Sequence, residues 1–454
     1  MNARLPENAL TTDQQHLIET IVNSDHTRLL VISPPGTGKT YSIPVAVSRL
    51  MERVLGFRAL ILAPAALCAL HVAMLADRLQ NEIPVVRIAG KSDWRIQQVA
   101  AEDGWKPGVY VISLDLAKQM DVAASLAASA WDLVVVDEAH MASGSRADLV
   151  ARLVGDERVR SLVLLSVLPL HDRRLTDGLS VVRWKRRDTG HPTRRLALIS
   201  YERTSAEQEL YIRLVKFLEV HSNSEAVAVR LERAWRSSVL ALEQVILRER
   251  SSLRASNSLA AGARRRPLSD PTVLSEPALQ EQAAETASAW PEPTAAARAM
   301  DGLLRDISSL SIDSKLEALL LAINRRRSME ESTPCIVTAM RESAIYIAQA
   351  LDSHQQSFEL VDGKRSIAFD TEVGAGGAVA VATDLGLKGI ELPADTIISY
   401  DLPRSRLRLE QRWGRIDRVG RDQPATMLAL RDTSGVDTVE DELLLMHGFI
   451  SPSA

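Results

Sequence analysis

The loop SPPGTGKT is the feature that most restricts how this chain can fold. It follows a strand-like apolar run, residues 29–33, and it precedes a helical segment, residues 42–51. A glycine-rich loop between a strand and a helix lets successive backbone N–H groups surround a phosphate at the amino end of the helix. The context therefore predicts an α/β sheet whose loop binds phosphate.

The runs around this loop predict a parallel sheet. From Leu29 to about Ser200, β-rich runs alternate with helical stretches, and a parallel sheet covered by helices on both faces follows from that rhythm. From about residue 310 the chain repeats the pattern on a smaller scale, with a helix at KLEALLLAINRRR, strands at CIVTA, FELV, AVAVAT and TIISY, and a helix at ESAIYIAQAL. The runs in the first stretch are LLVIS, ALILAP, PVVRIAG, VYVIS, LVVVDE, SLVLLS and RLALIS.

Four parts are predicted along the chain. Residues 1–200 form the first α/β domain, and 310–454 form the second. Between them, 201–254 carry apolar residues at helical spacing and predict two long helices. Residues 255–309 are rich in Ala, Ser, Pro, Glu and Arg, which predicts a flexible linker or insertion.

Composition restricts the class of protein more loosely. The 454 residues carry a net charge of −4, so a nucleic-acid site would have to be a local basic surface. The two cysteines, Cys68 and Cys335, lie in apolar runs and are expected to pack in cores. No apolar run reaches the roughly 20 residues of a membrane span, and we expect a soluble, cytoplasmic protein without a membrane partner.

Individual roles in the phosphate loop follow from its chemistry. The backbone of Gly36, Thr37 and Gly38 would surround the phosphates of ATP, Lys39 would reach the β- and γ-phosphates, and the Thr40 hydroxyl would ligate Mg²⁺. Two neighbours complete the expected loop, namely Pro35 and Ser33, the latter standing where such a loop usually begins with glycine.

An acidic pair is expected opposite the loop. The apolar run LVVV ends in Asp137, Glu138, Ala139 and His140. The carboxyl end of a parallel strand faces the ligand edge of the sheet. We therefore expect Asp137 to hold Mg²⁺ through water and Glu138 to orient and deprotonate the attacking water.

A third pattern, QRWGRIDRVGR, spans residues 411–421. Planar guanidinium groups stabilise charge on a transferring phosphoryl group, so Arg415 and Arg418 are candidate arginine fingers. In isolation, an arginine-rich helix is more often a solvated face.

The order of these motifs resembles superfamily 2 helicases, especially the chromatin-remodeller-type translocases and the bacterial ATPase that recycles RNA polymerase. The resemblance covers most of the chain except the linker and implies two RecA-like domains. LTTDQQHLIETI resembles the motif whose glutamine contacts adenine, with Gln14 in place and Gln15 a near rival. APAALCALHV and VISLDLA resemble segments that touch the nucleic-acid backbone, at Pro64 and Ser113.

The second domain carries its own resemblances. VATDLGLKGIELPADTIISYDLP is similar to the family's fifth motif, which implies that Thr383, Asp384 and Gly389 lie near the domain interface, with Gly389 at the nucleotide. The continuation LEQRWGRIDRVGR is similar to the sixth motif. For contact with nucleic acid or for coupling, the resemblance adds His140 and Gln411.

Two stretches depart from the family. The family normally has two hydroxyl side chains in its coupling motif. SLVLLSVLPLHDR stands at that place; it retains one hydroxyl, that of Ser166, and has apolar side chains in place of the other. The stretch 358–383 is short and predicts the loss of a helix between two strands. A reduced second domain of this kind implies a protein partner subunit.

Together these features predict an ATP-driven motor on nucleic acid, with DNA favoured over RNA. Because only 4% of residues are aromatic, a base-stacking platform is not evident, which favours tracking a duplex over separating strands. Basic clusters at 325–327 and at Arg404, Arg406 and Arg408 are candidate phosphate contacts, although the first fits a solvated charge run. The alternatives are a protein-remodelling motor and a non-catalytic ATP switch, and nucleoid association in a bacterium is implied by resemblance only.

Overall fold

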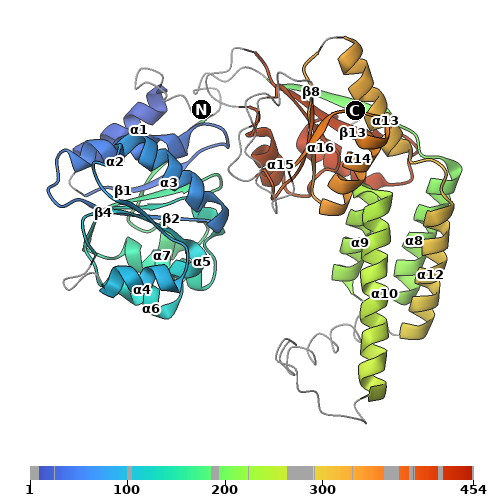
Figure 1. Cartoon of the computed structure of the whole chain (residues 1–454), viewed down its shortest axis with the longest axis horizontal. Helices are drawn as coiled ribbons and strands as arrows, with labels where there is room; N and C mark the ends of the chain where they lie inside the picture. The colour runs from blue at the N-terminus through green and yellow to red at the C-terminus, as the bar shows by residue number, and fades with distance from the viewer. Residues whose placement is uncertain are drawn as a thin grey trace. The chain divides into compact units, whose positions relative to one another are not determined.

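The structure, a computed structural model, describes part of the chain in two units (Figure 1). Unit 1 comprises Met1–Arg194, Lys388–Glu391 and Glu410–Ala425, and unit 2 comprises Arg195–Leu387, Leu392–Leu409 and Thr426–Ala454. The described residues are 10–24, 26–99, 105–185, 194–222, 224–262, 290, 292–329, 331–361, 378–387, 392, 394–417 and 423–451.

Unit 1 is built on a seven-stranded sheet in which every pair of neighbours is parallel. Its strands are β1 (Arg28–Ile32), β2 (Arg58–Ala63), β3 (Val85–Ile88), β4 (Gly108–Ser113), β5 (Trp131–Val136), β6 (Val159–Ser166) and β7 (Ser180–Arg183). Their order is β3-β4-β2-β5-β6-β1-β7. Six of these strands match runs expected from the sequence, whereas β7 was not expected; it pairs with β1 at the edge of the sheet.

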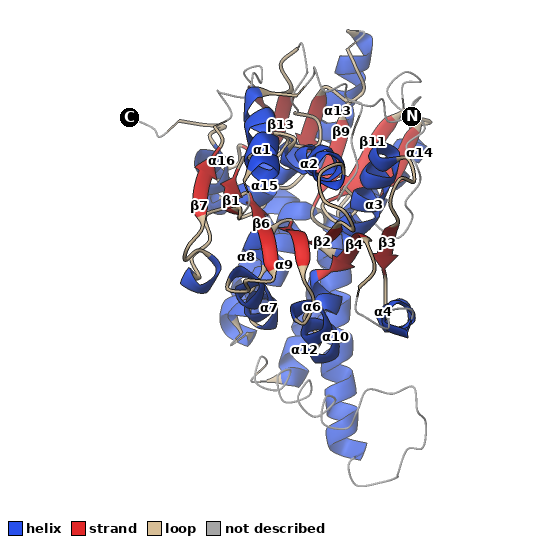
Figure 2. Ribbon diagram, turned by 90° about the vertical axis from the view of Figure 1, so that its left-hand side faces the viewer, coloured by secondary structure: helices blue, strands red, loops and turns tan. Residues whose placement is uncertain are grey.

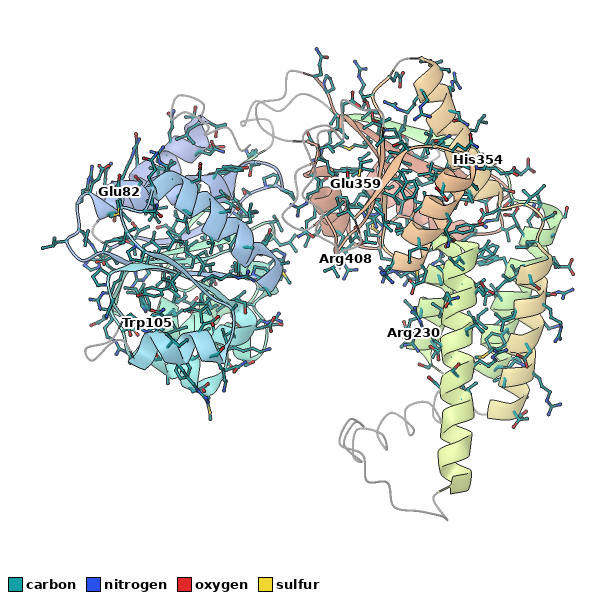
Figure 3. The ribbon with its side chains drawn as sticks, viewed as in Figure 1. Glu82, Trp105, Arg230, His354, Glu359 and Arg408 are labelled. Atoms are coloured by element: carbon teal, nitrogen blue, oxygen red, sulfur yellow. The ribbon has the colours of Figure 1, made fainter. Side chains whose placement is uncertain are left out.

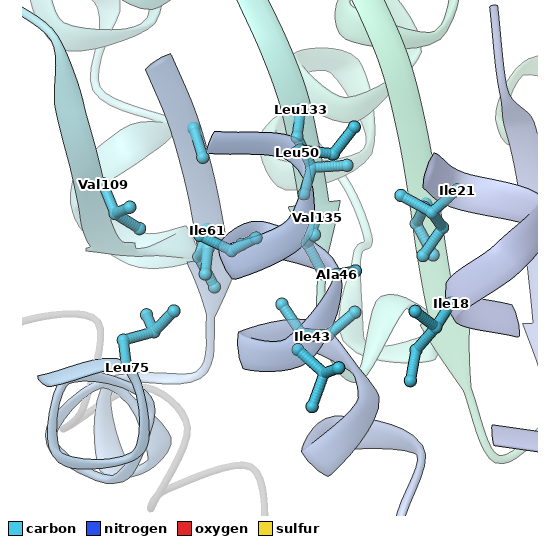
Figure 4. Packing of buried hydrophobic residues seen from close by; sticks show 14 of the residues in the cluster. Ile18, Ile21, Ile43, Ala46, Leu50, Ile61, Leu75, Val109, Leu133 and Val135 are labelled. Carbon is cyan, nitrogen blue, oxygen red and sulfur yellow. The ribbon is translucent and has the colours of Figure 1, made fainter. Parts of the chain in front are cut away.

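Helices cover both faces of this sheet. They are α1 (Thr12–Asn23), α2 (Ser42–Met51), α3 (Ala65–Leu79), α4 (Lys91–Val99), α5 (Leu114–Ala117), α6 (Met120–Ala127) and α7 (Ser145–Val154), with short 3-10 helices η2 (Lys39–Tyr41), η3 (Ala139–Met141) and η4 (Arg173–Leu175). Alternate residues of each strand point to opposite faces. Leu133 and Val135 of β5 therefore pack beneath α1, α2 and α3 (Figure 4), while Val134 and Val136 pack with α5, α6 and α7.

Unit 2 holds a second parallel sheet, in the order β10-β11-β9-β12-β13-β8. The strands are β8 (Arg195–Tyr201), β9 (Cys335–Thr338), β10 (Phe358–Val361), β11 (Val379–Thr383), β12 (Thr396–Ser399) and β13 (Thr426–Asp432). Helices α13 (Ser314–Ser328) and α14 (Arg341–Ser353) bury their apolar faces against it, and α16 (Thr438–His447) follows β13. Two parallel α/β sheets with flanking helices confirm the predicted fold class (Figure 2).

The remaining helices of unit 2 pack together and extend away from its sheet (Figure 1). They are α8 (Ser205–His221), α9 (Glu225–Ser237), α10 (Val239–Gly262) and α12 (Pro293–Ser309). Their shared core includes Trp235 and Trp290. Arg230 of α9, labelled in Figure 3, pairs with Glu249 of α10 at 2.8 Å. One further helix is α15 (Arg406–Trp413). The boundary between unit 2 and unit 1 falls within it, between Leu409 and Glu410.

Two boundaries differ from those expected. RLALIS was placed in the first domain, but β8 pairs with β13, because strand pairing joins distant segments that local periodicity cannot identify. Residues 293–309 were placed in the linker, but they form α12, whose Ala296, Met300 and Ile307 are buried at helical spacing. Within the stretch 358–383, where a helix is expected to be missing, residues 362–377 lie outside the described residues.

Both cysteines are buried and free, in agreement with a packing role. Among the helices of the described ranges, none is both long enough and apolar enough to cross a membrane.

Replacing Leu133 by alanine should lower the free energy of unfolding by about 2–5 kcal/mol, because the side chain is fully buried in the apolar core between the sheet and the helices that cover it. Urea denaturation followed by tryptophan fluorescence measures this change. The matched control is Leu55→Ala at a fully exposed leucine, for which a change within about 0.5 kcal/mol is expected. Equal losses in both variants would contradict this packing.

Candidate functional site

The phosphate loop leaves the carboxyl end of β1 and leads through η2 into α2. Gly36 and Gly38 have φ angles of 80° and 74°, a left-handed conformation that glycine adopts without steric cost. A Cβ on Gly38 would lie 2.2 Å from Nε2 of Gln14, so only a residue without a side chain fits at this position. Lys39 is almost fully buried at the start of η2.

Gln14 attaches α1 to this loop. Its Nε2 donates to the carbonyl of Thr37 at 3.0 Å, and its Oε1 accepts from the Thr11 N–H at 3.0 Å, which completes a capping box at the start of α1. Gln15 is exposed and donates to the carbonyl of Leu10. Of the two glutamines, Gln14 is therefore the one that contacts the loop.

The carboxylate of Asp137 is fixed at the carboxyl end of β5. Its Oδ1 accepts from the Glu138 N–H at 2.9 Å, and its Oδ2 lies 3.0 Å from Nε2 of His71 on α3. The same Oδ2 lies 3.4 Å from Oγ1 of Thr40. Hydroxyl and carboxylate oxygens are the ligands that Mg²⁺ prefers, so these two side chains fit a hydrated magnesium ion. Among the described residues, no cluster of three or more His, Cys, Asp or Glu side chains could hold a metal by itself.

Glu138 adopts an unusual backbone conformation. Its φ of 52° and ψ of 45° are left-handed, which costs a non-glycine residue about 1–2 kcal/mol. Its Oε1 lies 3.9 Å from Nζ of Lys39, and its Oε2 lies 3.4 Å from Nδ1 of His140. Oε2 is buried without a hydrogen bond from the protein, so it can accept one from a water molecule.

Burial shifts the ionisation of these groups in different directions. Burial raises the pKa of Asp137, but the hydrogen bond and charge of His71 and the charge of Lys39 outweigh it, so this pKa lies below its ordinary value. Burial raises the pKa of Glu138, and the charge of Asp137 adds to that effect against Lys39 and Arg415. Burial and the Lys39 charge lower the pKa of His140 to about 4, so its imidazole is neutral near pH 7.

Unit 1 also contains residues 410–417, which meet the phosphate loop. The backbone oxygen of Asp417 would lie 2.3 Å from a Cβ on Gly36. Arg194 holds this segment by pairing with Asp417 and with Glu410, the latter at 2.7 Å, while its guanidinium lies 4.9 Å from the Trp413 ring centre. Arg415 acts electrostatically on Glu138 from here. Arg418 and Gly389 lie outside the described residues.

Most of the residues expected to contact nucleic acid lie at strand ends or at helix starts. Pro64 is the N-cap of α3, and Ser113 caps α5 by accepting from the Leu116 N–H at 3.2 Å. Ser166, at the end of β6, is buried and exchanges hydrogen bonds with the backbone of Leu168. Thr383 ends β11 and accepts from the Gly386 N–H, Asp384 follows it, and Gln411 lies on α15.

The arginines of the two basic clusters differ in their contacts and in their exposure. Arg326 donates to Thr396 Oγ1 at 2.7 Å and pairs with Glu331 at 2.8 Å, so it serves the packing of α13. Its neighbours at 325 and 327 are exposed. Arg404 lies 3.6 Å from Glu232, and Arg408 is exposed (Figure 3).

One residue beside the acidic pair was not anticipated. His71 lies within APAALCALHV, which was interpreted only through its resemblance to a nucleic-acid-contacting segment. The available signal was a histidine in register with Cys68, Leu75 and Leu79, the buried face of α3.

Comparisons with known proteins bear on the fold and on the class of protein. A family model described as "AAA domain" matches residues 9–165. RNA polymerase-associated protein RapA of Vibrio campbellii is 26% identical over 140 residues, which span 28% of this chain and only 14% of RapA. The uncharacterized ATP-dependent helicase YqhH of Bacillus subtilis is 23% identical over 464 residues, covering 97% of this chain and 78% of that protein.

A solved structure is similar to this chain over most of its length. The helicase domain of Hef from Pyrococcus furiosus has a TM-score of 0.55 at 15% identity and covers 95% of this chain and 97% of its own. The fold is thus that of two RecA-like domains. The likeness to an ATP-dependent helicase and the match to the AAA family model support ATP hydrolysis as the enzymatic activity.

Glu138→Asn should raise the free energy of unfolding by about 1 kcal/mol relative to Glu138→Gln, because asparagine tolerates the left-handed conformation better. Both variants remove the charge and carry an amide, so they differ only in backbone preference and in one methylene group. Thermal denaturation of both variants measures it, and an asparagine variant no more stable than the glutamine variant would refute the strain.

Proposed function

We propose that this chain couples ATP hydrolysis to translocation along double-stranded DNA. The observation that carries the proposal is the convergence of Lys39, Thr40, Asp137 and Glu138, with 3.9 Å between Lys39 Nζ and Glu138 Oε1 and 3.4 Å between Thr40 Oγ1 and Asp137 Oδ2. An ATP-dependent, helicase-like motor is the coarser activity that the relatives support.

In this proposal the phosphate loop binds the triphosphate. The backbone N–H groups of Gly36, Thr37 and Gly38 surround the phosphates, and Lys39 contacts the β- and γ-phosphates. Thr40 and Asp137 would hold a hydrated Mg²⁺, which would neutralise phosphate charge. The remaining nucleotide contacts are assigned to Gln14, Pro35 and Gly389.

Glu138 acts as the general base. A water molecule hydrogen-bonded to the Glu138 carboxylate attacks the γ-phosphorus, and its proton passes to the carboxylate as the bond to the bridging oxygen of ADP breaks. A carboxylate whose pKa is raised by burial accepts this proton more readily than an ordinary one. The Glu138 carboxylate lies near Lys39, which contacts the phosphates in this proposal, so the base lies close to the γ-phosphate.

Arg415 and Arg418 are the proposed arginine fingers. Guanidinium groups stabilise the charge that spreads over the γ-phosphoryl oxygens in the transition state. The electrostatic action of Arg415 on Glu138 supports the first assignment, and the motif alone supports the second.

The choice of duplex DNA rests on composition. Only 4% of residues are aromatic, so stacking of separated bases is a poor basis for binding, whereas a backbone-tracking surface needs polar contacts. The proposed contact and coupling residues are Pro64, Ser113, His140, Ser166, Thr383 and Gln411. The hydroxyl of Ser166 is already used by Leu168, which favours a coupling role over direct contact.

A protein partner subunit belongs to the proposal as well. RapA is named as RNA polymerase-associated, and a comparable protein partner is proposed for this chain. A motor on chromosomal DNA would act in the cytoplasm, at the nucleoid.

Lys39→Ala and Glu138→Gln should each lower the ATP turnover rate at least about 100-fold, since one removes a phosphate contact and the other the general base. Glu138→Gln should still bind ATP, and Lys39→Ala should not. Steady-state phosphate release and fluorescent-nucleotide binding measure the two effects. The control is Lys91→Ala, at an exposed lysine paired with Asp121, which should leave the rate unchanged. An unaltered rate in Glu138→Gln would favour the non-catalytic ATP switch.

Duplex DNA should stimulate this turnover at least about tenfold more than single-stranded DNA or RNA, because only its regular backbone offers the tracked surface. The same preparation should displace a third strand from a triplex without separating the duplex. If the duplex strands separate in this assay, the activity is unwinding and not translocation alone. Stimulation by RNA alone would overturn the DNA assignment. Turnover indifferent to every nucleic acid would favour a protein-remodelling motor.

A further inference from the structure

His71 occupies a core position of α3 that apolar packing alone does not explain. Cys68, Leu75 and Leu79 share its helix face and belong to the apolar core of unit 1. The imidazole is only 1% exposed. Burying a polar ring without a partner costs about 1–3 kcal/mol in proteins. The feature that offsets this cost is the carboxylate of Asp137, whose Oδ2 lies 3.0 Å from Nε2 of His71.

The donor in this contact follows from the chemistry of the two groups. An ionised carboxylate only accepts hydrogen bonds, so Nε2 of His71 must carry the hydrogen. The two oxygens of Asp137 are then oriented from two directions, Oδ1 by the Glu138 N–H at 2.9 Å and Oδ2 by His71. Two contacts of this kind define the rotation of the carboxylate plane.

That rotation decides how Asp137 meets Thr40. Oδ2 faces both the His71 Nε2 and, at 3.4 Å, the Thr40 hydroxyl. Because α3 follows β2, and β2 neighbours β5 in the sheet, the helix brings His71 beside the end of β5. The imidazole is anchored by the core and not by the nucleotide loop, so it can fix Asp137 before any ligand binds.

We propose that His71 is a positioning residue for magnesium-nucleotide binding, holding Asp137 Oδ2 toward Thr40 through its Nε2–H. It stabilises the nucleotide only when the metal accompanies it. The inference rests on the proposed function, in which Thr40 and Asp137 hold the hydrated ion. Hydrogen-bonding partners of metal-binding side chains typically contribute about 10- to 100-fold to metal affinity.

The decisive experiment compares His71→Leu with His71→Gln in the full chain. Glutamine restores an N–H near the position of Nε2, and leucine fills the space without one. Calorimetry gives the dissociation constant of a non-hydrolysable ATP analogue with Mg²⁺ and with EDTA. His71→Leu should weaken binding at least about 10-fold with Mg²⁺ and less than about 2-fold with EDTA, and His71→Gln should recover most of the loss.

Controls separate this inference from general damage and from failure of the proposed function. His16→Leu, at an exposed histidine on α1, should change neither constant. Equal weakening with and without Mg²⁺, or no rescue by glutamine, would reduce His71 to a packing residue. If the wild-type chain does not bind the analogue with Mg²⁺, or if Lys39→Ala binds it equally well, the proposed function itself fails and the inference falls with it.

Discussion

The parallel direction of every strand in the first sheet is the constraint on which the site depends. It brings the loop after β1 and the acidic pair after β5 to the same edge, although about a hundred residues separate them in the chain. A carboxylate buried at that edge is costly unless its oxygens are hydrogen-bonded. Asp137 meets this requirement through the Glu138 N–H, His71 and Thr40. The sheet thus supplies position, and the surrounding polar atoms make an ionised group tolerable there.

Unit 2 depends on a different set of buried charges. Arg203 pairs with Asp432 at 2.8 Å, and Glu207 accepts from the Ser314 N–H at 3.0 Å. Lys315 donates to the Arg236 carbonyl, and Arg236 pairs with Asp437 at 2.8 Å. These contacts join the starts of α8, α13 and α16 to the end of α9, so the helical bundle is tied to the sheet by polar atoms as well as by its apolar core. Removing one partner would leave an uncompensated charge, which costs more than the pair contributes.

The sequence predicted those parts of the fold that local pattern determines. Six strands of the first sheet follow from apolar runs, and Lys39, Thr40, Asp137 and Glu138 follow from short motifs with known chemistry. Non-local pairing escaped it, since nothing within RLALIS distinguishes a partner in one sheet from a partner in the other. The helix at 293–309 was overlooked because alanine-rich composition concealed the spacing of Ala296, Met300 and Ile307. The contact of His71 could not be derived, because a histidine in an apolar run gives no indication of what it faces.

The position of β8 at the edge of the second sheet has a consequence for biosynthesis. Arg203, two residues beyond this strand, finds its partner Asp432 only 229 positions later. At about 5–20 residues per second, a ribosome needs on the order of 10–50 s to supply that partner. During this interval the nascent β8 has no edge to join, and its backbone donors and acceptors are available to chaperones or to another nascent chain. The second sheet can therefore be completed only late in synthesis, after β13 has been made.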